Sequence, residues 1–257
     1  MRELLTARWE LVLSAQSFRW VRRSLWGRWP AQCVQEQWVD PALGEAERWV
    51  ALAHFLENAP VRYQPVRVSV DASWVYEATV QPLAQAQSWQ DVQAYSAMRM
   101  QEIFELSQPL VVVCEPPKDG PCWVSAMPES TLADLKRLLS AQRLALVSCV
   151  PQWTLVWNHV PVAAQVDALL MLQEQSSHLV LARAGRVVGV KHWTFAVNRL
   201  SEPELRSALA QEVKRLSLPM PARWGVVGRS RLPQVDDWVF ERLGDCADVL
   251  SVWGVKP

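Results

Sequence analysis

The sequence offers few side chains that could act together in catalysis or metal binding. Its histidines are His54, His159, His178 and His192, and no two of them have the spacing of a metal motif. Asp71 and Glu77 lie in or beside predicted strands, where a carboxylate pair could serve general acid–base catalysis. Such a pair also arises by chance on any charged surface. We therefore expect no catalytic residues and no metal site.

Motifs that bind phosphates or position a nucleophile are absent from the sequence. It has no Gly-x-x-x-x-Gly-Lys-Ser/Thr loop, no Gly-x-Gly-x-x-Gly and no Gly-x-Ser-x-Gly. Cys114 and Cys122 are expected near the facing ends of a hairpin, where two buried thiols are far commoner than a redox pair. Five cysteines are too sparse for a disulfide framework, and the first ten residues do not form a signal peptide. Together these features favour a reducing cytoplasm.

Composition places the chain in a broad class. Its 257 residues suit one large or two modest domains, and half of them are apolar, which excludes a disordered chain. The 26 basic and 26 acidic residues leave no net charge to attract nucleic acid or acidic membranes. No apolar run reaches the length of a membrane span. Fifteen tryptophans are scattered along the chain, which favours core packing over stacking on a ligand.

The chain contains two similar successions of three strands, a helix and a strand. Runs rich in β-branched and aromatic residues, separated by turn-sized gaps, predict the strands. The first succession is expected to have strands at residues 9–13, 17–24, 31–39 and 66–70. The second is expected to have strands at residues 166–172, 178–183, 186–193 and 223–227. The repeated order indicates an architectural duplication, although the halves share no residue identity.

Several helix ends can be predicted from capping residues. Asp40-Pro41 is expected to supply the N-cap and first-turn proline of the first helix, which Asn58-Ala59-Pro60 stops. In the second succession Ser201-Glu-Pro-Glu204 is a capping box. A further helix is expected from Pro233 to Leu243, and a last strand at residues 249–253.

A different set of elements separates the two successions. A strand is expected at residues 74–80, followed by a long helix at 89–106 that Ser88 opens. Two strands and a second amphipathic helix complete this insert, at residues 110–114, 122–126 and 129–143. A strand at residues 144–150 and a helix from Pro151 then return the chain to the first succession.

This layout is similar to the actin-like fold, an α/β architecture of duplicated ribonuclease H-type β-β-β-α-β lobes, here with a β-α-β-β-α insert in the first lobe. More narrowly, the chain resembles the group formed by PilM and the cytoplasmic part of GspL, components of type IV pilus and type II secretion assembly platforms. The segments that carry the resemblance are VRVSVDASWVYEATVQP (66–82), RLALVSCVPQ (143–152) and LVLARAGRVV (179–188). It implies a first lobe at 1–73 plus 144–165, an inserted subdomain at 74–143 and a second lobe at 166–257.

The chain departs from the ATP-binding pattern of this fold. Such a member needs an Asp-x-Gly type hairpin in each lobe, where glycine admits the phosphates to backbone amides and aspartate organises magnesium. The corresponding turn at residues 13–19 has neither Asp nor Gly, and the turn at 172–178 has no Gly. The residues of any residual cleft are Ser14, Gln16, Ser17, Gly225, Gly228 and Ser230. We therefore expect no cofactor and no ATP hydrolysis.

The resemblance implies a non-catalytic cytoplasmic scaffold that reaches the inner membrane through its partners. These partners would be the cytoplasmic tail of a membrane protein or the assembly ATPase. A tail could add to an exposed edge strand or fill a groove beside the insert. The candidate partner-binding residues on the insert helix are Trp89, Tyr95, Met98 and Met100. Burial of these side chains against the lobe is an equal alternative, and homodimerisation stays open.

Two other functions remain as alternatives. The first is a nucleotide-binding actin-like ATPase with a degenerate cleft, which the missing phosphate turns disfavour. The second is an enzyme of the ribonuclease H type, which requires carboxylates clustered on the first and fourth strands. The sequence offers only Glu10 on the first of these strands and Asp71 at the end of the other.

Overall fold

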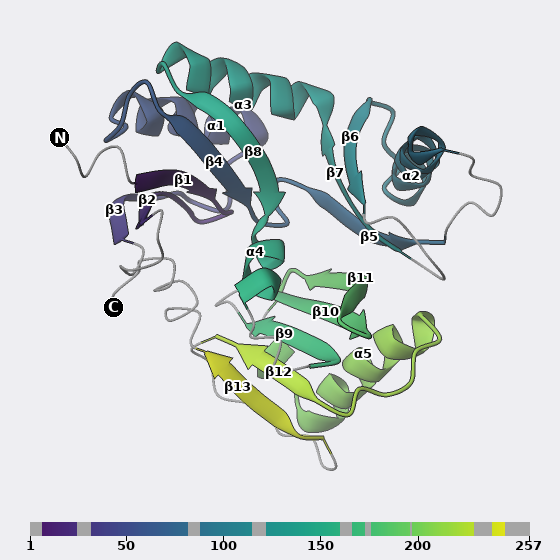
Figure 1. Ribbon diagram of the computed structural model, residues 1–257. Helices are drawn as coiled ribbons and strands as arrows, with labels where there is room; N and C mark the ends of the chain where they lie inside the picture. The colour runs from purple at the N-terminus through teal and green to yellow at the C-terminus, as the bar shows by residue number, and fades with distance from the viewer. Residues whose placement is uncertain are drawn as a thin grey trace. The chain divides into compact units, whose positions relative to one another are not determined.

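The computed structural model describes residues 7–24, 32–81, 88–114, 122–159, 166–172, 176–195, 197–228 and 238–244. These residues form two five-stranded sheets and one three-stranded sheet (Figure 1). They fall into two compact units. The described parts of the first unit lie in Met1–Val75 and Met127–Leu155, and those of the second lie in Tyr76–Ala126 and Val156–Val249.

The sheet of the first unit has the order β3-β2-β1-β4-β8. Its strands are β1 (Ala7–Leu13), β2 (Ser17–Ser24), β3 (Gln32–Trp38), β4 (Pro65–Val70) and β8 (Ala145–Pro151). β1, β2 and β3 form an antiparallel meander, whereas β1, β4 and β8 are parallel. Alternation in β1 directs Trp9, Leu11 and Leu13 to one face, where they join a buried core. The predicted strands are confirmed here.

Two helices cover this apolar face, α1 (Glu45–Glu57) and α3 (Glu129–Ala141), which lie on the same side of the sheet in Figure 1. Leu52, Phe55 and Leu56 of α1 and Leu135 and Leu139 of α3 are buried in the shared core. Because α3 contributes to this core, it is part of the first compact unit even though the sequence places it in the insert.

The predicted start of α1 is wrong. The helix begins at Glu45 with Gly44 as its N-cap, and the Glu47 carboxylate accepts the Gly44 N–H at 3.0 Å. Asp40 forms a turn instead, accepting the Ala42 N–H at 2.9 Å. An aspartate followed by proline suits this Asx-turn as well as an N-cap, and the glutamate three residues after Gly44 decides the position. The helix ends at Asn58, as predicted.

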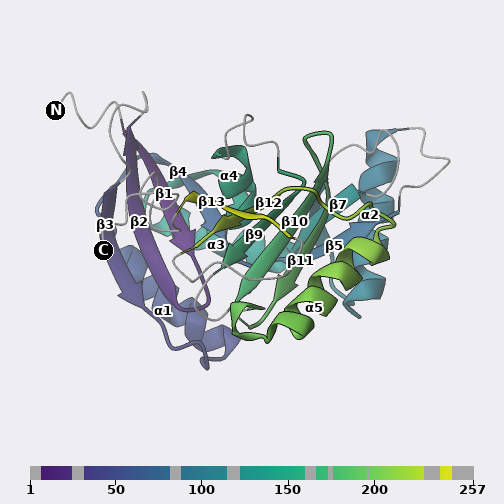
Figure 2. The same ribbon diagram turned by 90° about the horizontal axis from the view of Figure 1, so that it is seen from below.

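The larger sheet of the second unit repeats this order as β11-β10-β9-β12-β13. Its strands are β9 (Ala168–Leu172), β10 (Ser177–Arg183), β11 (Arg186–Trp193), β12 (Trp224–Val227) and β13 (Phe240–Gly244). β10 and β11 meet at Ala184 and Gly185, whose φ values of 51° and 74° make the predicted tight turn. α5 (Glu202–Arg215) lies along one face of the sheet (Figure 2) and buries Leu205, Leu209 and Val213 there.

The helix predicted over residues 233–243 is wrong where the structure describes it. Residues 240–244 form β13, parallel to β12. The Trp238 ring stacks on Trp224 at 4.8 Å, and the Phe240 ring packs against Trp224 at 5.6 Å. Residues two apart that contact the same ring favour a strand, whose side chains alternate, over a helix. The predicted strand at 249–253 lies outside the described residues.

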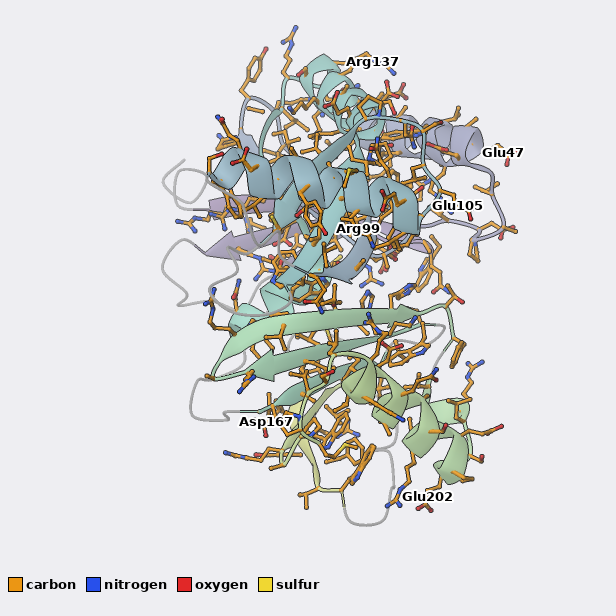
Figure 3. The ribbon with its side chains drawn as sticks, turned by 90° about the vertical axis from the view of Figure 1, so that its right-hand side faces the viewer. Glu47, Arg99, Glu105, Arg137, Asp167 and Glu202 are labelled. Atoms are coloured by element: carbon orange, nitrogen blue, oxygen red, sulfur yellow. The ribbon has the colours of Figure 1, made fainter. Side chains whose placement is uncertain are left out.

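The insert supplies the third sheet, of order β5-β7-β6, together with α2. Its elements are β5 (Tyr76–Val80), α2 (Trp89–Ile103), β6 (Leu110–Cys114) and β7 (Cys122–Pro128). Ser88 accepts the Asp91 N–H at 3.1 Å and Asp91 accepts the Ser88 N–H at 2.8 Å, which confirms the predicted helix start. α2 runs across the front of Figure 3, where Arg99 is labelled on it, and packs on one face of the sheet.

Within the second unit, β5 of the insert contacts β11 of the larger sheet. Gly189 of β11 lies close to both neighbours, because a Cβ there would lie 3.2 Å from Oγ1 of Thr79 on β5 and 2.2 Å from Cδ1 of Leu216 at the end of α5. The division into compact units therefore places the insert sheet with the second lobe. The predicted division into two lobes and an insert follows strand order instead, and it stays a prediction.

The remaining described helices are short. α4 (Gln152–His159) follows β8, close to its predicted start, and a single 3₁₀ turn spans Val197–Arg199. None of the described helices is both long and apolar enough to cross a membrane. Several of the described tryptophans are buried, as core packing predicts, and these are Trp9, Trp20, Trp74, Trp153 and Trp224.

Candidate functional site

The turn between β1 and β2 is the one that the resemblance to the actin-like fold assigns to phosphate binding in ATP-binding members. Ser14 organises it from within: its hydroxyl accepts the Ser17 N–H at 2.9 Å and the Gln16 N–H at 3.3 Å. The Ser14 and Ser17 hydroxyl oxygens lie 3.2 Å apart. The backbone carbonyl of Gln16 accepts the Val39 N–H at 2.7 Å. The three predicted residues of this turn therefore lie together, and the Ser14 hydroxyl binds the backbone amides of Gln16 and Ser17 within it.

Asp71 closes the same turn from the end of β4. Its Oδ2 accepts the Ala15 N–H at 2.7 Å, and its own N–H donates to the Leu13 carbonyl at 3.0 Å. Its Oδ1 accepts the Ser73 N–H at 2.8 Å and also the Ser73 hydroxyl. β1 and β4 are parallel neighbours, so their carboxyl ends meet at one edge of the sheet and bring Asp71 to the turn.

The Asp71 carboxylate has a chemical consequence for ligand binding. It is an internal anion bound to the Ala15 amide, a group that a phosphate would otherwise contact. A phosphate at the same amide would have to displace this carboxylate and would then meet its negative charge at close range, where the repulsion amounts to about 4 kcal/mol near a protein surface. The turn is thus closed to an anionic ligand as it stands.

Gly225 and Gly228, two of the residues predicted for a residual cleft, have packing reasons to be glycine. A Cβ on Gly225 would lie 2.3 Å from Cδ1 of Leu243. Gly228 has φ of 147°, and a Cβ there would lie 2.5 Å from the carbonyl oxygen of Leu172. Both glycines are explained without a nucleotide. Ser230 and residues 173–175 of the second predicted turn lie outside the described residues.

The four candidate partner-binding residues on α2 do not form one surface. Met100 is fully buried in the insert core, and Tyr95 packs partly buried against that core. Trp89 is 40% exposed and Met98 is 46% exposed. These two residues are nine positions apart, which at 100° per residue places them on opposite sides of the helix. Of the four, Trp89 and Met98 are the exposed ones, and a single partner surface on one side of α2 would not reach both.

The two carboxylates of the ribonuclease H alternative are engaged separately. Glu10 is 4% exposed, and its Oε2 accepts from Nε of Arg23 on β2 at 2.6 Å. Asp71 is bound in the turn described above. Neither carboxylate has a described metal-binding neighbourhood, because no three His, Cys, Asp or Glu side chains group to hold an ion within the described ranges.

A buried polar cluster that the sequence did not predict joins the insert to the larger sheet of the second unit. His178 of β10 lies with Nε2 3.8 Å from Oε2 of Glu77 on β5, and both side chains are 4% exposed. The His178 ring lies 4.6 Å from the ring of His192, its cross-strand partner on β11. Burial, and to a lesser degree the charge of His192, lowers the pKa of His178 from 6.5 to about 3. The His178 imidazole is therefore neutral at physiological pH.

The sequence signal that could have paired His178 with a residue of β11 is the register counted from the hairpin turn. A β-bulge makes this count wrong by one residue. From the Arg183–Arg186 pair beside the turn, a regular ladder would place Lys191 opposite His178. The register shifts between Leu181 and Ala182, and His192 takes that place instead.

Comparison with known proteins identifies the architecture. No protein-family model and no curated protein matches the sequence. Solved structures do match. The cytoplasmic domain of EpsL, an inner membrane component of the type II secretion system of Vibrio cholerae, superposes with a TM-score of 0.60 at 14% identity, over 98% of this chain and 96% of that one. The chain has the actin-like ATPase fold.

Two further structures support this assignment. The PilM-PilN type IV pilus biogenesis complex matches with a TM-score of 0.57 at 15% identity, covering 86% of this chain and 81% of that one. A Bacteroides thetaiotaomicron protein with an actin-like ATPase fold and unknown function matches with a TM-score of 0.58 at 12% identity, covering 90% and 84%. The predicted fold class and the predicted structural similarity to PilM and to the secretion-system cytoplasmic domain are confirmed.

Proposed function

We propose that this protein is a non-catalytic scaffold of a bacterial inner-membrane assembly platform, of the pilus or type II secretion kind. It docks the cytoplasmic tail of a membrane protein or the assembly ATPase, and it works at the cytoplasmic face of the inner membrane, where its partners hold it. The observation that carries the non-catalytic part is the Asp71 carboxylate on the Ala15 amide.

The physical argument against phosphate chemistry starts from that contact. An actin-like ATPase uses free backbone amides at its hairpin turns to bind phosphates, with glycine to let them approach. Here the Ser14 hydroxyl and the Asp71 carboxylate occupy three consecutive amides of the turn, those of residues 15–17. Each of these bonds would have to break before a phosphate could bind.

The argument for a docking role comes from the relatives. One similar structure is a cytoplasmic domain of an inner membrane secretion component, and another is a complex of two pilus biogenesis proteins. Both cover most of this chain and most of their own length. By this likeness, a short cytoplasmic tail of a membrane protein is the first partner to test.

The alternative is a nucleotide-binding ATPase with a degenerate cleft, which the fold itself favours because other members of it bind ATP. A thermal-shift measurement with and without about 1 mM magnesium-ATP separates the two functions. A site of micromolar affinity would stabilise the protein by about 4 kcal/mol, or several degrees for a chain of this size. We expect no shift, and a clear shift would contradict the scaffold proposal.

The positive test is binding of a tail peptide. Synthetic peptides that cover the cytoplasmic tails of the single-span membrane proteins encoded beside this protein would be labelled and titrated by fluorescence anisotropy, with a scrambled peptide of equal charge as the control. We expect saturable binding of one tail and none of its scrambled version. Failure of every tail and of the assembly ATPase to bind would overturn the proposal.

A further inference from the structure

Three hydrogen-bond donors converge on the carboxylate of Asp71. Its Oδ2 accepts the Ala15 N–H at 2.7 Å, and its Oδ1 accepts both the Ser73 N–H at 2.8 Å and the Ser73 hydroxyl. One donor belongs to the β1–β2 turn, and two belong to the segment between β4 and β5. The carboxylate is therefore held as a bound anionic ligand would be, because its charge strengthens each of these bonds.

The three donors are positioned by contacts that do not involve the carboxylate. The Asp71 N–H donates to the Leu13 carbonyl at 3.0 Å, and the Asp71 carbonyl accepts the Trp74 N–H at 3.1 Å. Trp74 is buried, and its ring lies 5.3 Å from the ring of Trp49 on α1. All of these residues belong to the first compact unit. A variant without the carboxylate should thus keep the donors in place.

The charge around Asp71 distinguishes a carboxylate site from a phosphate site. Among the contacts of the described residues, no lysine, arginine or histidine pairs with the Asp71 carboxylate. Arg19, which lies just beyond the same turn, pairs with Glu36 at 2.6 Å. Neutral donors match the single charge of a carboxylate, whereas phosphate recognition commonly recruits arginine or lysine. The three donors therefore suit a carboxylate better.

A group from outside the chain can reach these donors. Ser73 is exposed, and Ala15 and Asp71 are half-buried. The donors lie at the edge of the sheet where the carboxyl ends of the parallel strands β1 and β4 meet. Open α/β sheets bind their ligands at this edge.

We propose that Ala15 and Ser73 form a carboxylate-binding site, which Asp71 fills from within the chain as an internal competitor. The proposal rests on the proposed function and deepens it, because the external carboxylate is an acidic side chain of a docked tail. Asp71 is attached beside the site, so its effective concentration exceeds that of a free ion. A docked tail gains the same advantage from its other contacts, and its acidic side chain can then replace Asp71.

Chemical rescue of Asp71→Ala tests the site. The variant leaves the three donors without their carboxylate, and sodium acetate is the probe that replaces it. For a weak site with a dissociation constant of about 50 mM, 0.2 M acetate should raise the thermal midpoint of D71A by about 2–4 °C relative to the wild type in the same salt. Comparison with the wild type removes the general effect of salt on stability. Sodium phosphate at equal ionic strength should give a smaller difference.

Matched variants locate the effect. Asp40→Ala removes another turn aspartate of the first unit, whose carboxylate accepts one described hydrogen bond, from the Ala42 N–H. D40A should show no acetate difference. Ser73→Ala, added to D71A, removes the hydroxyl donor and should raise the dissociation constant of acetate about tenfold. Circular dichroism establishes that each variant is folded, and Asp71→Ser is the second variant should D71A fail to fold.

A capped aspartate, N-acetyl-aspartate amide, tests whether the site admits a side chain of a protein. It should stabilise D71A as acetate does, and its failure to do so would overturn the assignment to a tail side chain. The site itself would be overturned by the absence of an acetate difference in the folded variant, by an equal difference in D40A, or by phosphate acting as strongly as acetate. Wild-type protein with magnesium-ATP is measured in the same series, so a failure of the scaffold proposal is seen separately.

Discussion

Acid should destabilise this protein through His178. The imidazole is fully buried beside Glu77 and His192, and its pKa in the folded protein is about 3. In the unfolded chain an ordinary histidine has a pKa near 6.5. Between these two values the unfolded state binds a proton that the folded state does not, so the free energy of unfolding decreases as the pH falls below about 6.5.

The size of the effect follows from the pKa difference. Each pH unit below 6.5 removes about 1.4 kcal/mol, so lowering the pH from 7.5 to 5.0 should cost about 2 kcal/mol of stability. Above pH 6.5 both states hold a neutral imidazole and His178 contributes no slope. Among the described contacts, Glu77 is the one carboxylate beside this ring. Its Oε2 lies 3.8 Å from Nε2 of His178, which is longer than a hydrogen bond.

Urea unfolding followed by tryptophan fluorescence, at pH 7.5 and at pH 5.0, measures this loss. His178→Asn removes the titrating group, so the variant should lose about 2 kcal/mol less than the wild type over the same interval. His54→Asn is the control, because His54 is exposed on α1. If the wild type and H178N lose equal stability on acidification, the buried neutral imidazole is not the cause and the reasoning is refuted.

Three further substitutions, with Gly185→Ala as a control, test other contacts by the same unfolding measurement. Gly228→Ala should destabilise the second unit by at least about 2 kcal/mol, because its Cβ would strike the Leu172 carbonyl and its φ is 147°. Gly185→Ala has open space around its Cβ and should cost only about 1 kcal/mol. Equal losses of stability in the two variants would contradict the packing explanation of Gly228. Ser88→Ala removes the N-cap of α2 and should cost about 1 kcal/mol, with a lower helical signal in circular dichroism. Asp71→Asn weakens the closure of the β1–β2 turn and should cost about 1–2 kcal/mol, and a gain in stability would show that the carboxylate strains the turn.

Local signals account for the parts of the fold that the sequence predicts well. The apolar residues Trp9, Leu11 and Leu13 predict a strand that joins the core, and no distant residue is needed to see it. The capping residues Ser88 and Asp91 are three positions apart, so the start of α2 can be predicted within one turn of chain. The repeated strand order follows from such local assignments and leads directly to the fold class.

The start of α1 was mispredicted although its capping glutamate lies only three residues from Gly44. The other features that the sequence missed arise where a distant contact decides between two local possibilities. The segment before Gly244 has apolar spacing that fits a helix, but the Trp224 ring selects the strand because Trp238 and Phe240 both pack on it. The Asp71–Ala15 bond joins residues 56 positions apart, and nothing near either one in the sequence indicates it. His178 meets His192 only because one bulge shifts the ladder. Each of these features depends on tertiary packing, which a local pattern does not contain.

The contrast between the β1–β2 turn and β6 indicates which kind of ligand the described surface suits. In the turn, the chain fills its own amides with Ser14 and Asp71, so the first unit needs no ligand to satisfy them. Among the described strands, β6 is at one edge of the insert sheet, with Val111 and Val113 partly exposed on its open face. The internal anion at the β1–β2 turn therefore supports the scaffold proposal over the ATPase alternative, because a phosphate at the Ala15 amide would have to displace it.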